Sequence, residues 1–412
     1  MFEISFLEQI ISDQKKNFTD KNFGTEREVD FDKYLRNKQI VVISGIRRSG
    51  KSTLLRQFAK RFSSYYYLTF DDERLFNFGV EDFNNLLLAF KKHGAAKTFF
   101  LDEVQNVIGW ERFARRLYEE GYKVFVTGSN AKLLSGELAT HLTGRYFKIE
   151  LYPFSFREFL SFKDAPLLPI SSSATAGILK MFDEYFAKGG FPEVVSYNDN
   201  EFLRRIYDDV LLKDIVARFG VRETKTFKQL ANYLFSNVGK EASYNGLKNI
   251  LGVKSVMSIR KFVNFMEEAY LIFELPKYDF SLKKQFVSDK KIYVIDNGLR
   301  NEVSFAFSED RGRLLENLVF IELKRRGREL FYFKDSGECD FLISEKNKIK
   351  EAIQVAVELN VGNQEREVNG LVEAMKMARL SVGTILTFGA EKNIKRGDFA
   401  IKVLPVWKWL LD

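Results

Sequence analysis

The sequence predicts an α/β protein with a parallel sheet in its N-terminal third, then a helical region, then a second mixed part. Between residues 38 and 150, short apolar runs of strand length alternate with amphipathic stretches that are long enough for crossover helices. From residue 176 to residue 268 the apolar residues recur at helical spacing, and after residue 290 strand-like and helix-like stretches alternate again. The five predicted strands of the first part are Ile40–Ser44, Tyr65–Phe70, Thr98–Leu101, Lys123–Thr127 and Tyr146–Leu151.

The composition is that of an ordinary globular protein, with 45% hydrophobic and 29% charged residues among 412. No apolar run approaches the roughly 20 residues that a membrane span needs, and the first residues lack the basic start of a signal peptide. The single cysteine, Cys339, cannot form an internal disulfide, which is typical of a reducing compartment. We therefore expect a cytoplasmic protein without a membrane partner.

The charged and metal-binding side chains narrow the classes of partner. The formal net charge of +8 mildly favours an anionic partner such as nucleic acid, although a lysine-rich solvated surface would give the same balance. With one cysteine and two histidines, a Cys/His zinc site is excluded. Any metal should therefore be an oxygen-ligated ion such as Mg²⁺.

Residues 45–52 carry the clearest chemical motif. They match G-x-x-x-x-G-K-[ST] in full, after the apolar run 40–43 and before a helical stretch. In that context the two glycines permit a tight turn, and backbone N–H groups surround phosphates at the start of a helix. Lys51 would bridge the β- and γ-phosphates of ATP, and Ser52 would offer its hydroxyl group to Mg²⁺. The predicted nucleotide contacts are Gly45, Ile46, Arg47, Arg48, Ser49, Gly50, Lys51, Ser52 and Thr53.

Two acids follow the third apolar run, and they complete the motif. Asp102 and Glu103 come directly after Thr98–Leu101, at the end of a predicted strand. Asp102 would orient the Mg²⁺ shell, and Glu103 would position and polarise the attacking water. The alternative for Glu103 is an acidic residue that only favours the start of a helix. Because the complete P-loop stands upstream, the pair predicts a site for ATP hydrolysis.

Polar residues near the fourth and fifth strands are further candidates for catalysis. The run 123–127 ends in Gly-Ser-Asn, and either Ser129 or Asn130 could contact the γ-phosphate or the water; the alternative is a simple turn. Arg145 stands just before the fifth strand and could reach the γ-phosphate of a neighbouring subunit as an arginine finger. That role would require a homo-oligomer. A surface arginine in a salt bridge is the competing interpretation.

Further short motifs accompany the P-loop and the two acids. They are Phe70–Leu75, Leu101–Gln105, Gly109–Glu111, Gly128–Ser129, Leu142–Arg145, Pro153–Phe159, Gly189–Val194, Ile292–Leu299 and Gly337–Phe341. The set resembles prokaryotic AAA-type ATPases that carry a C-terminal domain of unknown function, over nearly the whole chain. The resemblance implies an AAA-type P-loop NTPase domain at 1–160, a helical lid or linker at 161–222, a winged-helix domain at 223–290 and a restriction-endonuclease-like domain of the PD-(D/E)xK type at 291–412.

The middle of the chain independently favours a winged helix-turn-helix. Thr226–Asn237, Ser243–Leu251 and Ser255–Glu268 read as three helices joined by short turns, and residues 270–275 follow as a strand. In such a module the third helix enters the major groove of DNA. The alternative is a module that contacts protein. The candidate DNA-binding residues are Lys254, Ser255, Ser258, Arg260 and Lys261.

From residue 312 onward, the predicted order of helix, three strands, helix and strand resembles the restriction-endonuclease-like fold. Its active form needs an acid on the second strand and an acid-x-lysine on the next, which hold Mg²⁺ and assist the attacking water. Asp340 fits the first acid, and Glu316 fits a helix acid of some relatives. Gln354–Ala356 stands where the acid-x-lysine is expected, although Lys350 or Glu358 could substitute from the same strand face. We therefore predict a degenerate scaffold that binds DNA or protein without efficient nuclease activity.

Three functions compete at this point. The leading hypothesis is an ATP hydrolase that is coupled to duplex or branched DNA through the winged helix. The second is a nucleotide-gated switch that binds another protein and hydrolyses ATP slowly. The third is a metal-dependent DNA nuclease.

Overall fold

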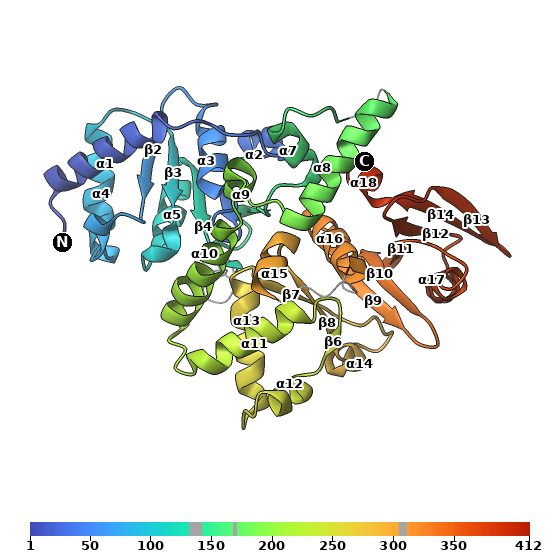
Figure 1. Cartoon of the computed structure of the whole chain (residues 1–412). Helices are drawn as coiled ribbons and strands as arrows, with labels where there is room; N and C mark the ends of the chain where they lie inside the picture. The colour runs from blue at the N-terminus through green and yellow to red at the C-terminus, as the bar shows by residue number, and fades with distance from the viewer. Residues whose placement is uncertain (132–141, 168–170, 305–310) are drawn as a thin grey trace. The chain divides into compact units, whose positions relative to one another are not determined.

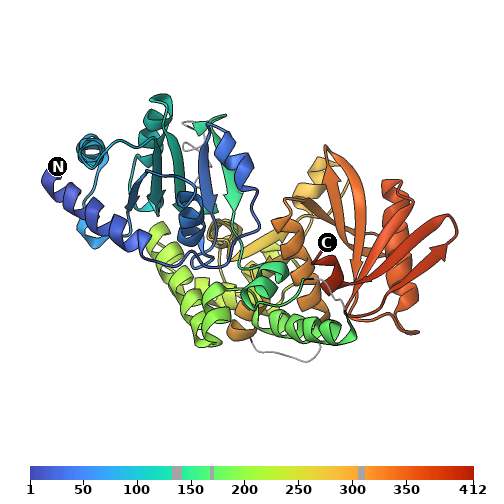
Figure 2. The same cartoon turned by 90° about the horizontal axis from the view of Figure 1, so that it is seen from above.

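The computed structural model describes residues 1–131, 142–167, 171–304 and 311–412 (Figure 1, Figure 2). The chain divides into two compact units, Met1–Tyr152 and Pro153–Asp412. Within the four described ranges, no helix is long and apolar enough to cross a membrane. The division between the units falls close to the predicted domain boundary at residue 160.

A five-stranded parallel sheet forms the centre of the first unit, in the order β2-β3-β4-β1-β5. Each strand agrees with its predicted range to within one residue at either end, so this part of the prediction is confirmed. Because all five strands run in the same direction, the segments that follow β1, β3 and β4 meet at one edge of the sheet. The strands are β1 (Ile40–Ser44), β2 (Tyr66–Thr69), β3 (Thr98–Asp102), β4 (Lys123–Gly128) and β5 (Tyr146–Glu150).

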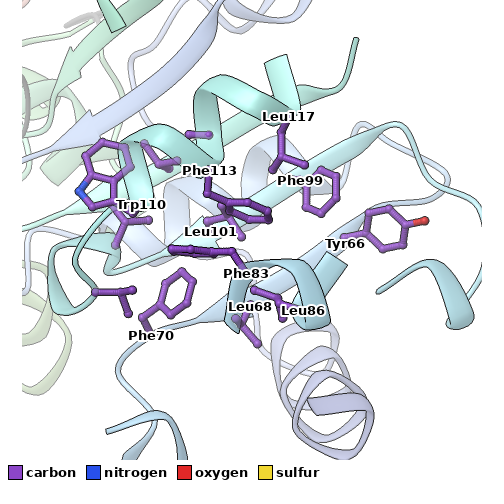
Figure 3. Close-up of a cluster of buried hydrophobic side chains, with 14 of the residues drawn as sticks. Tyr66, Leu68, Phe70, Phe83, Leu86, Phe99, Leu101, Trp110, Phe113 and Leu117 are labelled. Atoms are coloured by element: carbon purple, nitrogen blue, oxygen red, sulfur yellow. The ribbon is translucent and has the colours of Figure 1, made fainter. Parts of the chain in front are cut away.

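Helices cover both faces of this sheet, and side chains alternate between the faces as a strand requires. Ile40 and Val42 belong to one apolar cluster, whereas Val41 and Ile43 belong to the other. Figure 3 shows the first cluster, in which the rings of Phe83 and Phe113 stack 4.5 Å apart. The first cluster is covered by α1 (Ile4–Thr19), α4 (Phe83–Lys92) and α5 (Trp110–Glu119), and the second by α2 (Phe31–Arg36) and α3 (Lys51–Ala59).

The second unit starts with helices that are interrupted at Gly189 and Gly190. A Cβ atom on Gly189 would lie 2.0 Å from Oδ1 of Asp296, so only glycine fits there. The N–H of Gly190 donates to Oδ2 of Asp296 over 2.8 Å. These motif residues therefore fasten the helices to a later segment. The helices are α7 (Phe156–Phe162), α8 (Ser172–Lys188), α9 (Pro192–Tyr197), α10 (Glu201–Asp209) and the π-helix η5 (Val210–Ala217).

Three helices and a small antiparallel sheet, in the strand order β6-β8-β7, follow within the second unit. The three predicted helices and the predicted strand are confirmed to within two residues. Ser243 caps the second helix, where its Oγ accepts from the N–H of Gly246 over 3.0 Å. The pattern did not predict the short helix α14. In chain order the elements are α11 (Thr224–Ser236), β6 (Glu241–Ala242), α12 (Tyr244–Ile250), α13 (Val256–Glu268), β7 (Ile272–Leu275), α14 (Leu282–Val287) and β8 (Lys290–Val294).

A six-stranded sheet, in the order β13-β14-β12-β11-β10-β9, completes the second unit. Strands β9, β10 and β11 are antiparallel neighbours, whereas β11, β12 and β14 run parallel. The elements are α15 (Asn297–Val303), α16 (Arg311–Arg325), β9 (Glu329–Lys334), β10 (Glu338–Glu345), β11 (Lys348–Val355), α17 (Gln364–Ala378), β12 (Val382–Thr387), β13 (Lys392–Arg396), β14 (Phe399–Pro405) and α18 (Val406–Trp409).

The predicted boundaries after residues 222 and 290 both lie inside the second unit. Strand β8 spans the second of them, because it starts at Lys290 and continues to Val294. The division of residues 153–412 into separate domains stays a prediction.

Candidate functional site

The loop at residues 45–50 connects β1 to α3 and depends on its two glycines. Gly50 has φ = 95°, a left-handed conformation that favours glycine, and Lys51 starts the helix directly after it. A Cβ atom on Gly45 would lie 2.1 Å from the carbonyl oxygen of Leu151. Within the loop, the N–H of Ser49 donates to the carbonyl of Ile46 over 3.2 Å. The loop is therefore a tight turn at a helix N-terminus, as the motif predicted.

A buried arginine that sequence reasoning missed braces this loop. Arg27 donates from Nη1 to the carbonyl of Ser49 and from Nη2 to the carbonyl of Tyr152, each over 2.7 Å. Its own N–H donates to Oε1 of Gln57 over 3.3 Å, and Gln57 belongs to α3. Arg27 is 5% exposed. It therefore ties the loop, the helix after it and the end of the first unit to one another.

The predicted acids lie beside the loop. Asp102 is 3% exposed, and the hydroxyl groups of Ser52 and Thr127 hydrogen-bond to its carboxylate. Thr127 also accepts from the N–H of Glu103 over 2.9 Å. Lys51 donates to the carbonyl of Ile46 over 3.2 Å, and its Nζ lies 3.8 Å from Oε1 of Glu103. Four predicted residues from two separate segments, together with Thr127 from β4, thus form one polar cluster.

The environment of Asp102 makes its carboxyl group sensitive to protons and cations. Burial, followed by the charge of Glu103, raises the pKa of Asp102 to about 6, whereas the hydrogen bonds from Thr127 and Ser52 and the charge of Lys51 oppose that rise. A bound cation would favour the ionised form. One carboxylate next to one hydroxyl group is a donor set that suits Mg²⁺, which takes most of its remaining ligands from phosphates and water. The residues therefore fit this ion.

The two polar candidates after β4 differ in their surroundings. Ser129 is 2% exposed, and its Oγ lies 3.4 Å from Nε2 of Gln105, which also donates to Glu103. Asn130 is half-buried. Gln105 therefore links Ser129 to the predicted base, a connection that sequence reasoning missed.

Arg145 stands at the edge of the sheet that is opposite to the P-loop. It precedes β5, and its carbonyl accepts from the N–H of Ile40, the first residue of β1, over 2.8 Å. A five-residue strand is about 16 Å long. Arg145 therefore lies far from the phosphate site of its own chain, and a role at a γ-phosphate requires a second copy.

The candidate DNA-binding residues lie on or just before α13. Lys254, Arg260 and Lys261 are exposed, whereas Ser258 is half-buried. Ser255 is exposed, but its Oγ accepts from the N–H of Met257 over 3.2 Å and so caps the helix. The exposed basic groups leave this helix able to contact an anionic surface.

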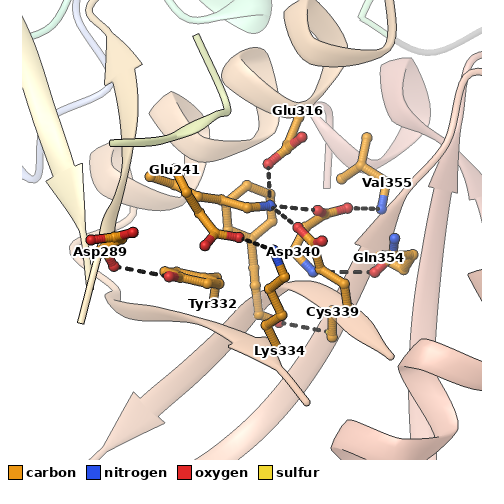
Figure 4. Close-up of polar contacts among 12 residues, drawn as sticks. Glu241, Asp289, Glu316, Tyr332, Lys334, Cys339, Asp340, Gln354 and Val355 are labelled. Atoms are coloured by element: carbon orange, nitrogen blue, oxygen red, sulfur yellow. Dashed lines mark hydrogen bonds and ion pairs between the residues drawn. The ribbon is translucent and has the colours of Figure 1, made fainter. Parts of the chain in front are cut away.

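A second polar cluster lies in the C-terminal part of the second unit. Figure 4 shows Glu316 from α16 and Asp340 from β10 around a common centre, and Gln354 from β11 beside Asp340, whose N–H donates to Oε1 of Gln354 over 3.1 Å. The ammonium group of Lys291, on β8, occupies this centre and is 3% exposed. Its Nζ lies 3.0 Å from Oε1 of Glu316, 2.7 Å from Oε1 of Glu338 and 3.1 Å from Oδ1 of Asp340. The three predicted residues are therefore neighbours, and a lysine that was not predicted joins two of them.

The arrangement of Lys291 does not fit the metal centre that the endonuclease resemblance implies. Its ammonium group takes the position in which a cation would contact both acids, and Gln354 offers an amide whose Nε2 donates to Glu367 over 2.7 Å. Ala356 is buried, and the proposed substitutes Lys350 and Glu358 are exposed. Across the described ranges, no group of three or more His, Cys, Asp or Glu residues is arranged to hold a metal. This centre is an ion cluster that is closed by an ammonium group.

Comparisons with known proteins agree with the first site. An AAA domain family matches residues 37–160, and a domain of unknown function, DUF8612, matches residues 179–310. The Walker-type ATPase paby2304 of Pyrococcus abyssi aligns with 69% of this chain and 99% of its own at 15% identity, with a TM-score of 0.43.

Two relatives match most of the chain at higher identity. The uncharacterized protein MJ1544 of Methanocaldococcus jannaschii is 39% identical over 92% of this chain and 89% of its own length. An uncharacterized protein of Haemophilus influenzae is 35% identical over 80% of this chain and 85% of its own. With a P-loop and two acids at one edge of a parallel sheet, and an AAA match over the same residues, the chain belongs to the family of these two proteins and carries an AAA-type P-loop domain.

Proposed function

We propose that this protein binds ATP with Mg²⁺ at the cluster of Lys51, Ser52, Asp102 and Glu103, and that it hydrolyses the nucleotide. The strongest support is that a lysine, a hydroxyl group and two acids lie close together at one edge of the sheet. The AAA match over residues 37–160 supports the same class of protein.

Each residue of the cluster has a distinct task in this mechanism. The loop N–H groups and Lys51 hold the phosphates, so the contact between Lys51 and Glu103 opens when nucleotide enters. Ser52 and Asp102 would hold Mg²⁺, which would neutralise charge on the phosphates when bound. Glu103 orients a water molecule and draws away its proton as the water oxygen bonds to the γ-phosphorus. The bond from that phosphorus to the bridging oxygen breaks, and ADP and phosphate leave. Ser129 or Asn130 contacts the γ-phosphate or the water.

The position of Arg145 supports a homo-oligomer with shared sites. Since the residue stands at the edge opposite to its own P-loop, we propose that it stabilises the γ-phosphate of a neighbouring copy. Arg145 would thus contribute to hydrolysis only in the assembled protein.

We propose DNA as the partner that is coupled to hydrolysis. The order of three helices and strands between α11 and β8 supports a winged helix, in which α13 would be the recognition helix, and α13 carries exposed basic residues. We assign residues 291–412 an endonuclease-like scaffold that binds DNA or protein without efficient cutting, because Lys291 closes the acidic centre.

Steady-state ATP hydrolysis by the full chain, with and without duplex or branched DNA, tests the proposal. We expect Mg²⁺-dependent turnover that DNA changes several-fold. Equal rates would remove DNA as the coupled partner. A single turnover with retained ADP would instead favour a nucleotide-gated switch that acts on a protein.

A further inference from the structure

The segment between β7 and β8, which contains α14, carries apolar side chains that are exposed to solvent. No residue of α14 is buried, although the helix contains Leu282, Phe286 and Val287. Phe286 is 78% exposed, and Phe280, just before the helix, is 79% exposed. A helix this short is not stable through its own hydrogen bonds, and its apolar face ordinarily packs on a core. We call residues 279–288 the apolar turn.

The base of the apolar turn is fixed to the six-stranded sheet. The N–H of Tyr278 donates to the carbonyl of Tyr332, on β9, over 2.7 Å, and the N–H of Tyr332 donates to the carbonyl of Pro276 over 3.0 Å. The ring of Tyr278 packs edge-on against Phe331 and Phe280, each with centroids 5.6 Å apart. Phe280 is therefore held on one side and open to solvent on the other.

The tip of the apolar turn is held by its own hydrogen bonds. The N–H of Ser281 donates to Oδ1 of Asp279 over 2.8 Å, and Nε2 of Gln285 donates to the carbonyl of Asp279 over 2.6 Å. The N–H of Gln285 donates to the carbonyl of Ser281 over 3.0 Å. The rings of the turn are thus presented on an ordered frame, and a ligand would not have to order it.

The charges on the apolar turn favour an anionic partner. Lys283 and Lys284 are exposed between the apolar residues; Lys284 lies 3.9 Å from Asp279, and Lys283 forms no ion pair with any residue in the described part of the chain. Exposed aromatic rings interleaved with lysines suit a nucleic-acid strand, because rings stack on bases while lysines neutralise phosphates. Stacking of this kind needs bases whose faces are free.

We propose that the apolar turn binds unpaired bases, as in single-stranded DNA or a frayed duplex end, through Phe280 and Phe286. The proposal rests on the DNA binding proposed above and specifies that the bound DNA has unpaired bases. The turn would hold a separated strand while α13 contacts the adjoining duplex.

Fluorescence anisotropy of the full chain tests this, with a labelled single strand, a duplex with a single-stranded overhang and a blunt duplex. We expect the probes with unpaired bases to bind more tightly than the blunt duplex. Phe280→Ala and Phe286→Ala should each weaken that binding about 5- to 150-fold, which is the contribution of one stacked base. Lys283→Gln should reduce the salt slope of binding by about 0.7. Tyr197→Ala is the matched control, because Tyr197 is 69% exposed on α9, and it should bind as the parent does.

The outcomes separate the turn from the rest of the proposed function. If the phenylalanine variants bind all three probes like the parent while Arg260→Ala weakens the duplex, the turn is not a strand contact and α13 alone binds DNA. If the parent protein binds none of the probes, neither the apolar turn nor α13 binds DNA. The proposed ATP hydrolysis is tested separately by the steady-state assay. If Phe286→Ala lowers the sedimenting mass of the free protein but not its affinity for the single strand, the turn is a contact between copies and the proposal is overturned.

Discussion

Replacing Lys291 with methionine removes the cation that three carboxylates share. The Lys291 ammonium is buried within 3.1 Å of an oxygen atom of Glu316, Glu338 and Asp340. Methionine keeps an unbranched apolar stem of similar length, so the packing changes little and the charge is the main loss. The acids then repel one another without a counterion, and we expect the second unit to unfold more easily.

The expected size of this effect follows from the burial of Lys291. Removing one partner of a buried ion pair costs about 3–5 kcal/mol, and each kcal/mol lowers Tm by about 2–4 °C in a large domain. Lys291→Met should therefore melt about 6–20 °C below the parent near pH 7.5. Burial and the charge of Glu316 already raise the pKa of Asp340 to about 7. Without the ammonium group the pKa of Asp340 should rise further, so the difference in Tm should shrink as the pH falls toward about 7, and should stay constant below that pH because Asp340 is then protonated in both proteins.

Thermal unfolding of the full chain, monitored by circular dichroism, tests this prediction by measuring the Tm of the parent and of Lys291→Met. Lys334→Met is the control, since Lys334 is 45% exposed and pairs with Glu241; its loss should cost less than about 1 kcal/mol. Mn²⁺ should raise the Tm of Lys291→Met, whose acids lack a cation, and should leave the parent unchanged. A variant that melts together with the parent, or a parent that Mn²⁺ stabilises as much as the variant, would refute the ion-cluster reasoning.

The remaining predictions concern the nucleotide site. The pKa of Asp102, about 6, lies about two units above its ordinary value, so the stability that its protonated form contributes is lost as the pH rises from about 4 to 6. Asp102→Asn removes a buried charge, so it should raise the free energy of unfolding at pH 7 by up to about 3 kcal/mol, and Tm with it. The same variant should weaken Mg²⁺-dependent ATP binding in calorimetry. Glu103→Gln should keep ATP affinity but stop turnover; hydrolysis at the parental rate would show that Glu103 is not the base. Lys51→Ala should greatly weaken nucleotide binding. Mixed Lys51→Ala and Arg145→Ala subunits should recover activity if sites are shared, and no recovery would leave Arg145 structural.

The parts of the nucleotide site that the sequence could predict are those set by local pattern. A P-loop is one continuous segment, and Asp102 and Glu103 stand at the end of an apolar run whose neighbours in the sheet run parallel to it. Parallel direction alone brings the ends of β1 and β3 to one edge, so knowledge of the strands was sufficient to place Lys51 near Glu103.

The missed residues act through contacts that no local pattern encodes. Arg27 braces carbonyl groups at Ser49 and Tyr152, which are far from it in the sequence. Lys291 precedes an apolar run, so its sequence position suggests an exposed lysine at the start of a strand. Its ammonium group nevertheless contacts acids on α16 and β10. The only available signal was the strand period of two, which places Lys291 and Tyr293 on the same face of β8. A buried lysine among apolar neighbours requires carboxylates, but only the fold identifies them.

Raised acid pKa values do not by themselves separate function from structure in this protein. Burial raises the pKa of both Asp102 and Asp296 to about 6. Asp296, however, accepts from backbone N–H groups of Gly190 and Leu299, which cannot turn away without breaking the fold. Asp102 is held by the hydroxyl groups of Ser52 and Thr127, which rotate freely enough to admit a cation. The partners of a buried acid, more than its proton affinity, therefore favour Asp102 over Asp296 as the acid that we propose to bind a ligand.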